Sequence, residues 1–241
     1  MQSLHRFSLF FVLGIFSLID PASPLSAQDQ KKSKGPERYE SAIAAFELRD
    51  KKTPPGENLL LFVGSSSIRK WDLEKFWPGY HVLNNGFGGS TLADSIFFFD
   101  RHMAPYRARA IVLYAGDNDI ARGLDAEGVL RDFKKLTDLI EKNTPGVPVI
   151  FIAIKPSIAR WKLWPEMKSA NDKIAAYCQE KKNLYFADIA APMLKNGKGK
   201  PDPGIFLSDG LHLNDRGYQL WKQVIAPILD QVGLHPKAVS R

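Results

Sequence analysis

Leu59-Leu60-Leu61-Phe62-Val63 is an unbroken apolar run, and Gly64-Ser65-Ser66-Ser67-Ile68 follows it directly. An apolar run of this length is typical of a strand that is buried on both faces of a parallel sheet. Serine is common at the start of a helix, so the second stretch predicts a turn from the strand into a helix. The chain therefore places hydroxyl groups at the carboxyl end of a buried strand.

Strand-like apolar runs and helical patterns alternate along the rest of the chain. Strands are predicted at 59–63, 81–83, 110–114, 147–154 and 184–186, and helices at 39–52, 94–103, 125–142, 162–181 and 214–231. This alternation implies right-handed crossovers and helices on both faces of one sheet. We expect an α/β protein with a three-layer α/β/α architecture and a five-stranded parallel sheet. Ligands bind beyond the carboxyl ends of the strands in such sheets, so functional residues are expected there.

The N-terminus has the pattern of a secretory signal peptide: Arg6 precedes an apolar run at 7–19, and Pro24-Leu25-Ser26-Ala27 ends the segment. The run is shorter than the roughly 20 apolar residues of a membrane-spanning helix, which predicts no stable membrane span after cleavage. We expect an exported protein, periplasmic or extracellular. The expected organisation is a signal peptide at 1–27, a leader and N-terminal helix at 28–57 and the main α/β domain at 58–241, with 28–241 as one structural unit.

The composition limits the possible partners. The formal charge is +7, but the lysines are scattered, and their small clusters at 31–34 and 195–200 indicate solvated loops. No nucleic-acid-binding motif accompanies them, so we expect no nucleic-acid partner. Cys178 is the only cysteine, which excludes an intramolecular disulfide. It lies in an apolar helical stretch and is predicted to be a buried hydrophobic residue rather than a nucleophile.

A serine at the end of the first strand could act as a nucleophile, because free backbone N–H groups and the helix dipole stabilise an oxyanion at such a turn. The alternative is a serine-rich N-cap. The Gly-x-Ser-x-Gly elbow of α/β-hydrolases is not satisfied, since Ile68 occupies the position of its second glycine.

The second and third strands are followed by glycine-rich and acidic segments. Asn84-Asn85-Gly86-Phe87-Gly88-Gly89-Ser90-Thr91 lacks the third glycine of a dinucleotide-binding loop, so it either presents backbone N–H groups to a ligand or makes a tight turn. Ala115-Gly116-Asp117-Asn118-Asp119 either forms a turn or directs the Asn118 amide into a cleft.

Near the end of the chain, Ser208-Asp209-Gly210-Leu211-His212 places an acid three residues before a histidine. A carboxylate at this spacing can hold an imidazole in one tautomer, as a general base requires. The alternative is an aspartate that caps the following helix. A metal site built from Asp117, Asp119, Asp209 and His212 is a further possibility, although no compact ligand spacing supports it.

Together these four blocks resemble the SGNH, or GDSL-type, hydrolase family over about 58–229, including its platelet-activating-factor acetylhydrolase-like branch. The resemblance implies a flavodoxin-like sheet and a cofactor-free serine esterase. It implies that Ser66 is the nucleophile, that Asp209 and His212 are the acid–base pair, and that Ser66, Gly89 and Asn118 form the oxyanion hole. The sequence departs from the family in one place, because Gly64-Ser65-Ser66 replaces Gly-Asp-Ser.

The resemblance implies a small-molecule, glycan or lipid-head-group ester as substrate, and the lack of a long apolar lid favours a short acyl group. Candidate substrate-binding residues are Ser65, Lys155, Trp161 and Trp164, although a tryptophan can equally pack a helix onto a core. Two other functions fit the sequence less well: a metal-dependent phosphoesterase and a non-catalytic glycan-binding domain on the same scaffold. The sequence carries no indication of an oligomeric state.

Overall fold

Five parallel strands form a single sheet in the computed structural model, which describes residues 35–195 and 197–237. The strands are β1 (Glu57–Gly64), β2 (Val82–Gly86), β3 (Arg107–Tyr114), β4 (Val149–Ile152) and β5 (Leu184–Ala187), in the order β2-β1-β3-β4-β5. The predicted α/β fold with five parallel strands is confirmed. The predicted signal peptide at 1–27 and the first residues of the predicted leader lie outside the described residues.

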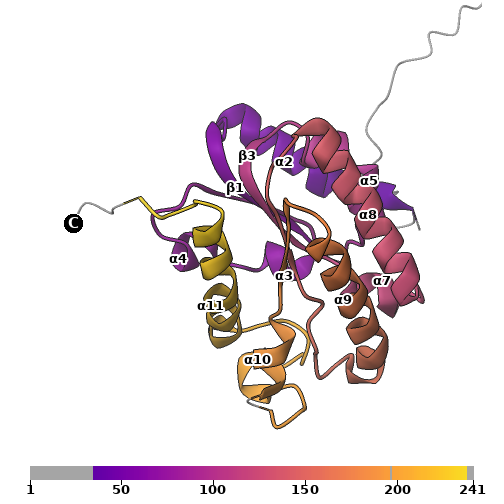
Figure 1. Ribbon diagram of the computed structural model, residues 1–241. Coiled ribbons are helices and arrows are strands. Elements are labelled where there is room, and N and C mark those ends of the chain that lie inside the picture. Colours follow the sequence, from indigo (N-terminus) through magenta and orange to yellow (C-terminus); the bar gives the residue numbers. More distant parts are fainter. Residues whose placement is uncertain (1–34, 196, 238–241) are drawn as a thin grey trace, which may run out of the picture.

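Helices cover both faces of the sheet (Figure 1). One face carries α5 (Leu92–Phe97), α6 (Phe99–His102), α7 (Asp117–Ala121), α8 (Ala126–Asn143) and α9 (Trp164–Gln179). The other carries α3 (Ser66–Arg69), α4 (Leu73–Phe76), α10 (Ala190–Lys195) and α11 (Asp215–Gln231). The fold therefore has the three layers that the alternation predicts.

The sheet separates two apolar cores because successive strand residues point to opposite faces. Along β1, Leu59 and Leu61 belong to the core beneath α8 and α9, whereas Leu60 and Phe62 belong to the core beneath α11. An aromatic cluster occupies the second core, in which the ring of Trp71 stacks on that of Tyr218 with 5.2 Å between centroids. Trp71 and Trp77 are 2% and 1% exposed.

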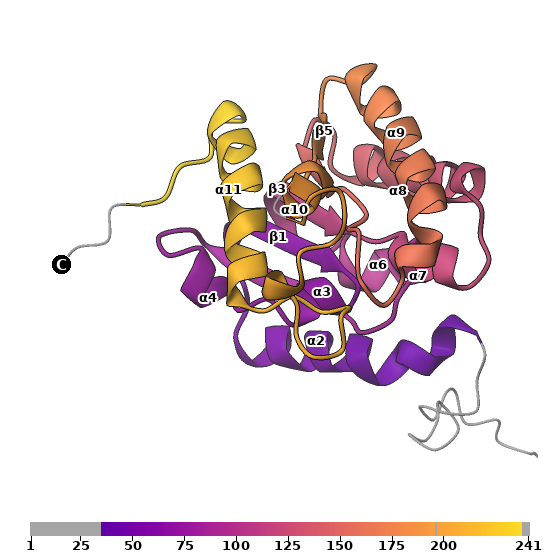
Figure 2. The same ribbon diagram turned by 90° about the horizontal axis from the view of Figure 1, so that it is seen from below.

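The N-terminal helix α2 (Glu40–Lys52) follows the short 3-10 helix η1 (Pro36–Tyr39) and lies along the β2 edge of the sheet (Figure 2). Ile43 packs with Phe87 and Phe98 in a third, smaller cluster. The Arg49 guanidinium donates to the backbone carbonyl of Asn84 at 3.0 Å and to Asn85 Oδ1 at 2.8 Å. The helix thereby covers the edge of the sheet nearest the segment that follows β2.

The strand β2 extends further than the sequence indicated. Asn84 and Asn85 were expected beyond the strand, but both lie within it. Their amide groups are satisfied inside the fold, since Asn84 Nδ2 donates to the carbonyl of Ile68 at 2.8 Å and Asn85 Nδ2 donates to that of His102 at 3.0 Å. The polar residues thus replace an apolar pair without leaving buried donors unpaired.

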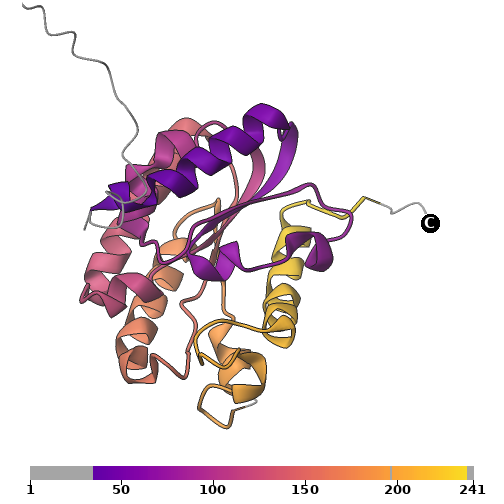
Figure 3. The ribbon, with the colours of Figure 1, turned by 180° about the vertical axis from the view of Figure 1, so that it is seen from behind.

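Several helices also differ from their predicted extents. The helix predicted at 94–103 is divided at Phe98 into α5 and α6, and the one predicted at 162–181 begins as the 3-10 helix η2 (Trp161–Leu163) before α9. The short helices α4, α7 and α10 were not predicted, because four to six residues are too few to show a helical period. The helix α3 begins at the strand-to-helix turn that was predicted after the first strand. A further 3-10 turn, η3 (Pro203–Ile205), precedes the loop that leads into α11. In Figure 3 the short helices α3 and α4 lie beside α11 on the side of the sheet opposite α8 and α9.

In the described part of the chain, no helix combines the length and apolar character needed to cross a bilayer.

The buried side chain of His102 is expected to make the fold less stable in acid. The side chain is fully buried, neither ring nitrogen has a hydrogen-bond partner within 35–195 and 197–237, and burial lowers its pKa from 6.5 to about 3. The unfolded chain therefore binds a proton more readily than the folded one between these values, so stability present above pH 6.5 is lost as the pH falls. We expect His102→Leu to reduce this loss by several kcal/mol, measured by urea unfolding from pH 7 to about 3. His81 is exposed, so His81→Gln should leave the dependence of the unfolding free energy on pH as in the wild type. If the unfolding free energies of His102→Leu and the wild type fell in parallel with pH, His102 would not be the cause of the loss.

Candidate active site

The turn after β1 leaves one of three serines accessible. Gly64 has φ 127°, and a Cβ at this position would lie 1.9 Å from the backbone oxygen of Tyr114, so only glycine fits between β1 and β3. The N–H of Ser65 then donates to the same carbonyl at 3.0 Å, and α3 begins at Ser66. Ser65 and Ser67 are fully buried, whereas Ser66 is partly exposed.

The Ser66 hydroxyl lies at the end of a hydrogen-bonded chain of three side chains. His212 Nε2 is 2.9 Å from Ser66 Oγ, and His212 Nδ1 is 2.6 Å from Asp209 Oδ2. With the proton of the neutral ring held on Nδ1 by the carboxylate, Nε2 is left as the acceptor for the hydroxyl proton. The structure thus brings Ser66 to the predicted pair of Asp209 and His212, from which it is distant in the sequence.

The loop that carries Asp209 and His212 is closed on itself. Asp209 Oδ1 accepts the backbone N–H groups of Leu211 and His212, both at 2.9 Å. The hydrogen bond from the His212 ring and these two N–H groups lower the pKa of Asp209, so the exposed carboxyl group is ionised at neutral pH. Asp209 therefore does not cap α11, because Asn214 Oδ1 accepts from the first N–H groups of that helix.

Two backbone N–H groups beside Ser66 are free to bind a ligand. Within residues 35–195 and 197–237, neither the N–H of Ser66 nor that of Gly89 has a hydrogen-bond acceptor. Gly89 has φ 82°, a conformation that favours glycine, and its carbonyl accepts from Arg122 Nη2 at 2.7 Å. The hydrogen bond from Arg122 to the Gly89 carbonyl thus holds the residue whose N–H is the predicted oxyanion donor.

Asn118 is fixed from both ends of its amide. Its Nδ2 donates to the backbone carbonyl of Ser90 at 2.9 Å, and its Oδ1 accepts from Arg160 Nη2 at 2.9 Å. The arginine determines which end of the amide is the oxygen, because it can only donate. One hydrogen of the Asn118 amide remains for a ligand at the hollow that this residue lines.

A buried ionic network lies behind these loops. Asp117 Oδ2 accepts from Lys155 Nζ at 2.9 Å and forms an ion pair with Arg160 Nη1 at 3.0 Å. Lys155 Nζ also donates to Tyr114 Oη at 2.9 Å and to Ser67 Oγ at 3.2 Å. Burial opposes ionisation of Asp117, but the two cations outweigh it and lower the pKa of the carboxyl group. The network joins the residue after Ser66 to the residue before Asn118.

Two of the four residues expected to bind substrate are enclosed by the protein. Lys155 is 1% exposed and is held by the buried network, and Ser65 is 0% exposed with a hydroxyl that has no partner in the described chain. Neither residue lines the hollow at Ser66, because the lysine turns inward to Asp117 and the close approach of β1 to β3 buries Ser65. The contacts of Arg160 with Asp117 and Asn118 were not predicted, because its only signal in the sequence was its place after the fourth strand.

Trp161 and Trp164 form a stacked pair, with ring centroids 6.2 Å apart and an interplanar angle of 10°. Trp164 packs against the core beneath α9, and both side chains are partly exposed. Neither lines the hollow at Ser66, although Trp161 directly follows Arg160, which does.

The hollow at Ser66 has a volume of about 450 Å³. Its lining consists of Arg38, Tyr39, Ser41, Ala42, Ser66, Arg69, Gly88, Gly89, Asn118, Arg160, Leu211 and His212. The predicted nucleophile, base and oxyanion donors therefore open onto one space, whose outer wall comes from η1 and α2.

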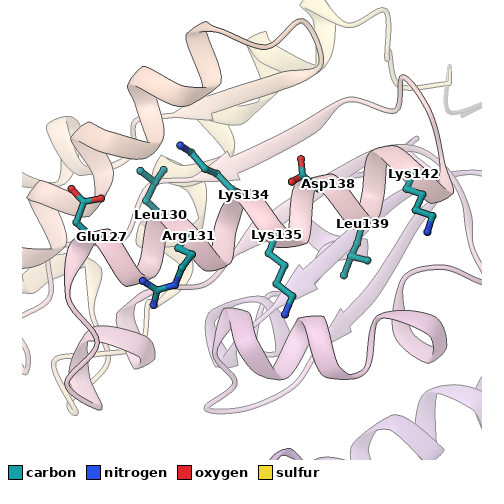
Figure 4. Close-up of a pocket in the computed structure, with 8 residues that line it drawn as sticks. All are labelled: Glu127, Leu130, Arg131, Lys134, Lys135, Asp138, Leu139 and Lys142. Carbon is teal, nitrogen blue, oxygen red and sulfur yellow. The ribbon is translucent and has the colours of Figure 1, made fainter.

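A larger hollow, of about 570 Å³, lies along α8 and contains none of the predicted site residues. Figure 4 shows that its lining comes from one helix, with long side chains such as Arg131, Lys134 and Lys142 spread along it. It is a furrow between solvated side chains rather than a site with convergent polar groups.

The alternative metal site is not assembled. Asp117 faces Lys155 and Arg160, and Asp119 accepts the backbone N–H groups of Leu92 and Gly116 at 2.9 and 3.0 Å. Across the residues that the structure describes, no three potential metal-ligating side chains of histidine, cysteine or acid type converge. The carboxylates of Asp117 and Asp119 are thus occupied by hydrogen bonds and ion pairs within the protein.

The arrangement of the site agrees with a comparison against protein families. The model of the GDSL-like lipase/acylhydrolase family matches residues 67–220, more than half of the chain. The chain belongs to this family. It is a hydrolase of the acylhydrolase type, as its resemblance to SGNH hydrolases implied. No curated protein sequence matched the chain.

Solved structures show the same fold. A Streptococcus pneumoniae protein described as a candidate platelet activating factor aligns with a TM-score of 0.70 and 18% identity, covering 79% of this chain and 92% of that one. A GDSL-like lipase from Bacteroides thetaiotaomicron aligns at 0.65 and 22%, covering 82% and 98%. A catalytic mutant of an acetylxylan esterase from Geobacillus stearothermophilus aligns at 0.60 and 15%, covering 77% and 99%.

The buried network makes a stability prediction. Asp117→Asn keeps the shape of the side chain but leaves two cations without their counter-charge, so we expect a loss of about 3 to 5 kcal/mol of unfolding free energy in urea titrations. The exposed Asp100→Asn should cost less than about 0.5 kcal/mol. Equal losses for the two variants would show that the network does not depend on this carboxylate.

Proposed function

We propose that the protein is an exported serine esterase that hydrolyses short-acyl esters of carbohydrate or lipid-head-group alcohols. The proposal rests above all on the chain from Asp209 through His212 to Ser66, with 2.6 and 2.9 Å between successive partners, which ends at an open hollow. An acid, an imidazole and a hydroxyl in this order form the arrangement that activates a serine for attack on a carbonyl group.

In the first half of the reaction, His212 Nε2 removes the proton of Ser66 as Oγ attacks the ester carbonyl. The N–H groups of Ser66 and Gly89 and the Asn118 amide bind the resulting oxyanion. Each well-placed donor lowers the barrier by about 3 kcal/mol. His212 then gives its proton to the departing alcohol as the bond from the carbonyl carbon to that oxygen breaks, which leaves an acyl group on Ser66.

In the second half, His212 removes a proton from water and the hydroxide oxygen attacks the acyl carbonyl. The same three donors bind the second oxyanion, and the proton on His212 returns to Ser66 Oγ as the carboxylic acid leaves. Asp209 stays ionised throughout and stabilises the imidazolium that forms in each half. These steps need only protein groups and water.

The lining of the hollow supports a short acyl group. Ala42 and Leu211 are its only aliphatic side chains, while arginine, serine, glycine and asparagine make up most of the remainder. A long acyl chain would lie against charged groups and would gain little from burial there. The stacked Trp161 and Trp164, next to Arg160, offer a flat apolar surface on which the alcohol could extend.

Export is proposed from residues 1–27, whose basic residue, apolar run and small residues have the pattern of a signal peptide. N-terminal sequencing of the protein from the periplasmic and extracellular fractions tests it, and an intact N-terminus in the cytoplasmic fraction alone would refute it.

Replacement of the nucleophile gives the first test. Ser66→Ala should lower ester hydrolysis by a factor of about a thousand or more, because no attacking oxygen remains. Ser65→Ala is a matched control from the same turn and should keep most of the activity, with circular dichroism confirming that both variants are folded. Full activity in Ser66→Ala would refute the assignment.

The acyl specificity gives the second test. We expect kcat/KM for p-nitrophenyl esters to be greatest for acetate or another short acid and to fall steadily towards dodecanoate, because the hollow offers no apolar channel. A maximum at octanoate or a longer acid would contradict this part of the proposal while leaving the esterase function intact.

A further inference from the structure

The hollow at Ser66 carries an unbalanced positive charge. Its lining includes Arg38, Arg69 and Arg160 but no aspartate or glutamate. We propose that Arg69 binds an anionic group of the substrate, such as a carboxylate or a phosphate, so that the preferred substrates are negatively charged esters. This inference rests on the proposed esterase function and defines its substrate class more narrowly.

Arg69 is positioned by the same element as the nucleophile. It is the last residue of α3, which begins at Ser66, so the two residues lie three positions apart and share one face of the helix. The guanidinium reaches across Gly88, where a Cβ would lie 3.0 Å from its Cζ, Nε and Nη2 atoms. Glycine at this position therefore leaves room for the guanidinium beside Gly89, which carries the free N–H.

The other two arginines of the hollow have counter-charges within the protein. Arg38 makes two hydrogen bonds to the Asp94 carboxylate, at 2.9 and 3.1 Å, and Arg160 pairs with Asp117 at 3.0 Å. Arg69 differs from both, because its guanidinium has no hydrogen-bond acceptor and no ion-pair partner within residues 35–195 and 197–237. The N–H groups of the Arg69 guanidinium are therefore available to a ligand in the hollow that this residue lines.

A guanidinium with open donors matches a carboxylate or a phosphate oxygen pair in both charge and geometry. The charges of Arg38 and Arg160 are balanced by Asp94 and Asp117, so Arg69 supplies the attraction for an anion in the hollow. A neutral ester would leave Arg69 to water, whereas an anionic ester would gain a charge-assisted pair close to the reacting carbonyl. The anionic group can belong to the acid or to the alcohol of the ester.

Matched ester pairs distinguish these two sources. For the acid side, p-nitrophenyl hemisuccinate is compared with the neutral p-nitrophenyl butyrate. For the alcohol side, 3-acetoxybenzoate is compared with the neutral 3-acetoxybenzamide. The quantity measured is the ratio of kcat/KM for the anionic ester to that for its neutral partner, in wild type and in Arg69→Gln.

We expect wild type to favour the anionic ester in at least one pair, and Arg69→Gln to lower that ratio about tenfold or more, mainly through KM, as for the loss of one hydrogen bond between charged groups. Arg69→Lys should restore part of the preference. Lys70→Gln removes the adjacent cation, which lines a different hollow with Asp72 and Asp215, and should change the ratio less than about twofold.

An unchanged ratio in Arg69→Gln, or an equal change in Lys70→Gln, would overturn the proposal. If wild type hydrolysed none of the four esters, the esterase function would fail instead. Calorimetric binding of 3-acetoxybenzoate and 3-acetoxybenzamide to wild type and Arg69→Gln would then still decide the role of Arg69. A selective loss of binding for the benzoate would support it, and equal binding would refute it.

Discussion

The carboxylate of Asp117 holds the site together, because two cations from the segment after β4, the buried Lys155 and the partly exposed Arg160, meet on it. Lys155 reaches from Asp117 to Ser67, the residue after Ser66, and Arg160 reaches from Asp117 to the amide oxygen of Asn118. Removing a charged partner from such a group leaves a buried ion without compensation, which is far more costly than the net gain of the intact pair. The network therefore fixes the turn of the proposed nucleophile relative to the proposed oxyanion donor, in addition to the backbone hydrogen bond from Ser65 to Tyr114.

The outer wall of the hollow comes from a part of the chain that the family model does not match. That model covers 67–220, whereas Arg38, Tyr39, Ser41 and Ala42 belong to η1 and α2. Arg122 connects this wall to the site, since its Nη2 donates to Tyr39 Oη at 3.2 Å and to the carbonyl of Gly89 at 2.7 Å. The residues that precede the matched range, Ser66 among them, thus contribute both to the reacting groups and to the space in front of them.

Much of the fold could be predicted from the sequence, because a strand buried on both faces must be apolar throughout. The runs at 59–63 and 110–114 show this pattern directly, and the rule that sites lie at the carboxyl ends of parallel strands selects the segments that contain Ser66, Gly89 and Asn118. Asn84 and Asn85 broke the pattern of β2, because their amides bond to distant backbone carbonyls that sequence spacing does not show.

Lys155 shows the same limit for the site. A lysine after an apolar strand is ordinarily exposed, since burial of its charge is unfavourable without a partner. Its partner Asp117 is 38 residues away and lies beside it only once β3 and β4 are paired. The role of Arg160 depends on the same pairing. Residues that contact the hollow could be selected by their position after a strand, but residues that support them are identified only by their three-dimensional contacts.

Two carboxylates of the site, Asp117 and Asp209, lie at different depths. Asp117 is buried and is kept ionised by Lys155 and Arg160, so its charge holds these two side chains in position. Asp209 is nearly half exposed and is kept ionised by the His212 ring and two backbone N–H groups of its own loop. The exposed unit needs no buried cation, since Asp209, Leu211 and His212 form one short closed segment. A base that is assembled within a single surface loop can reach Ser66 without disturbing the buried network on the other side of the nucleophile turn.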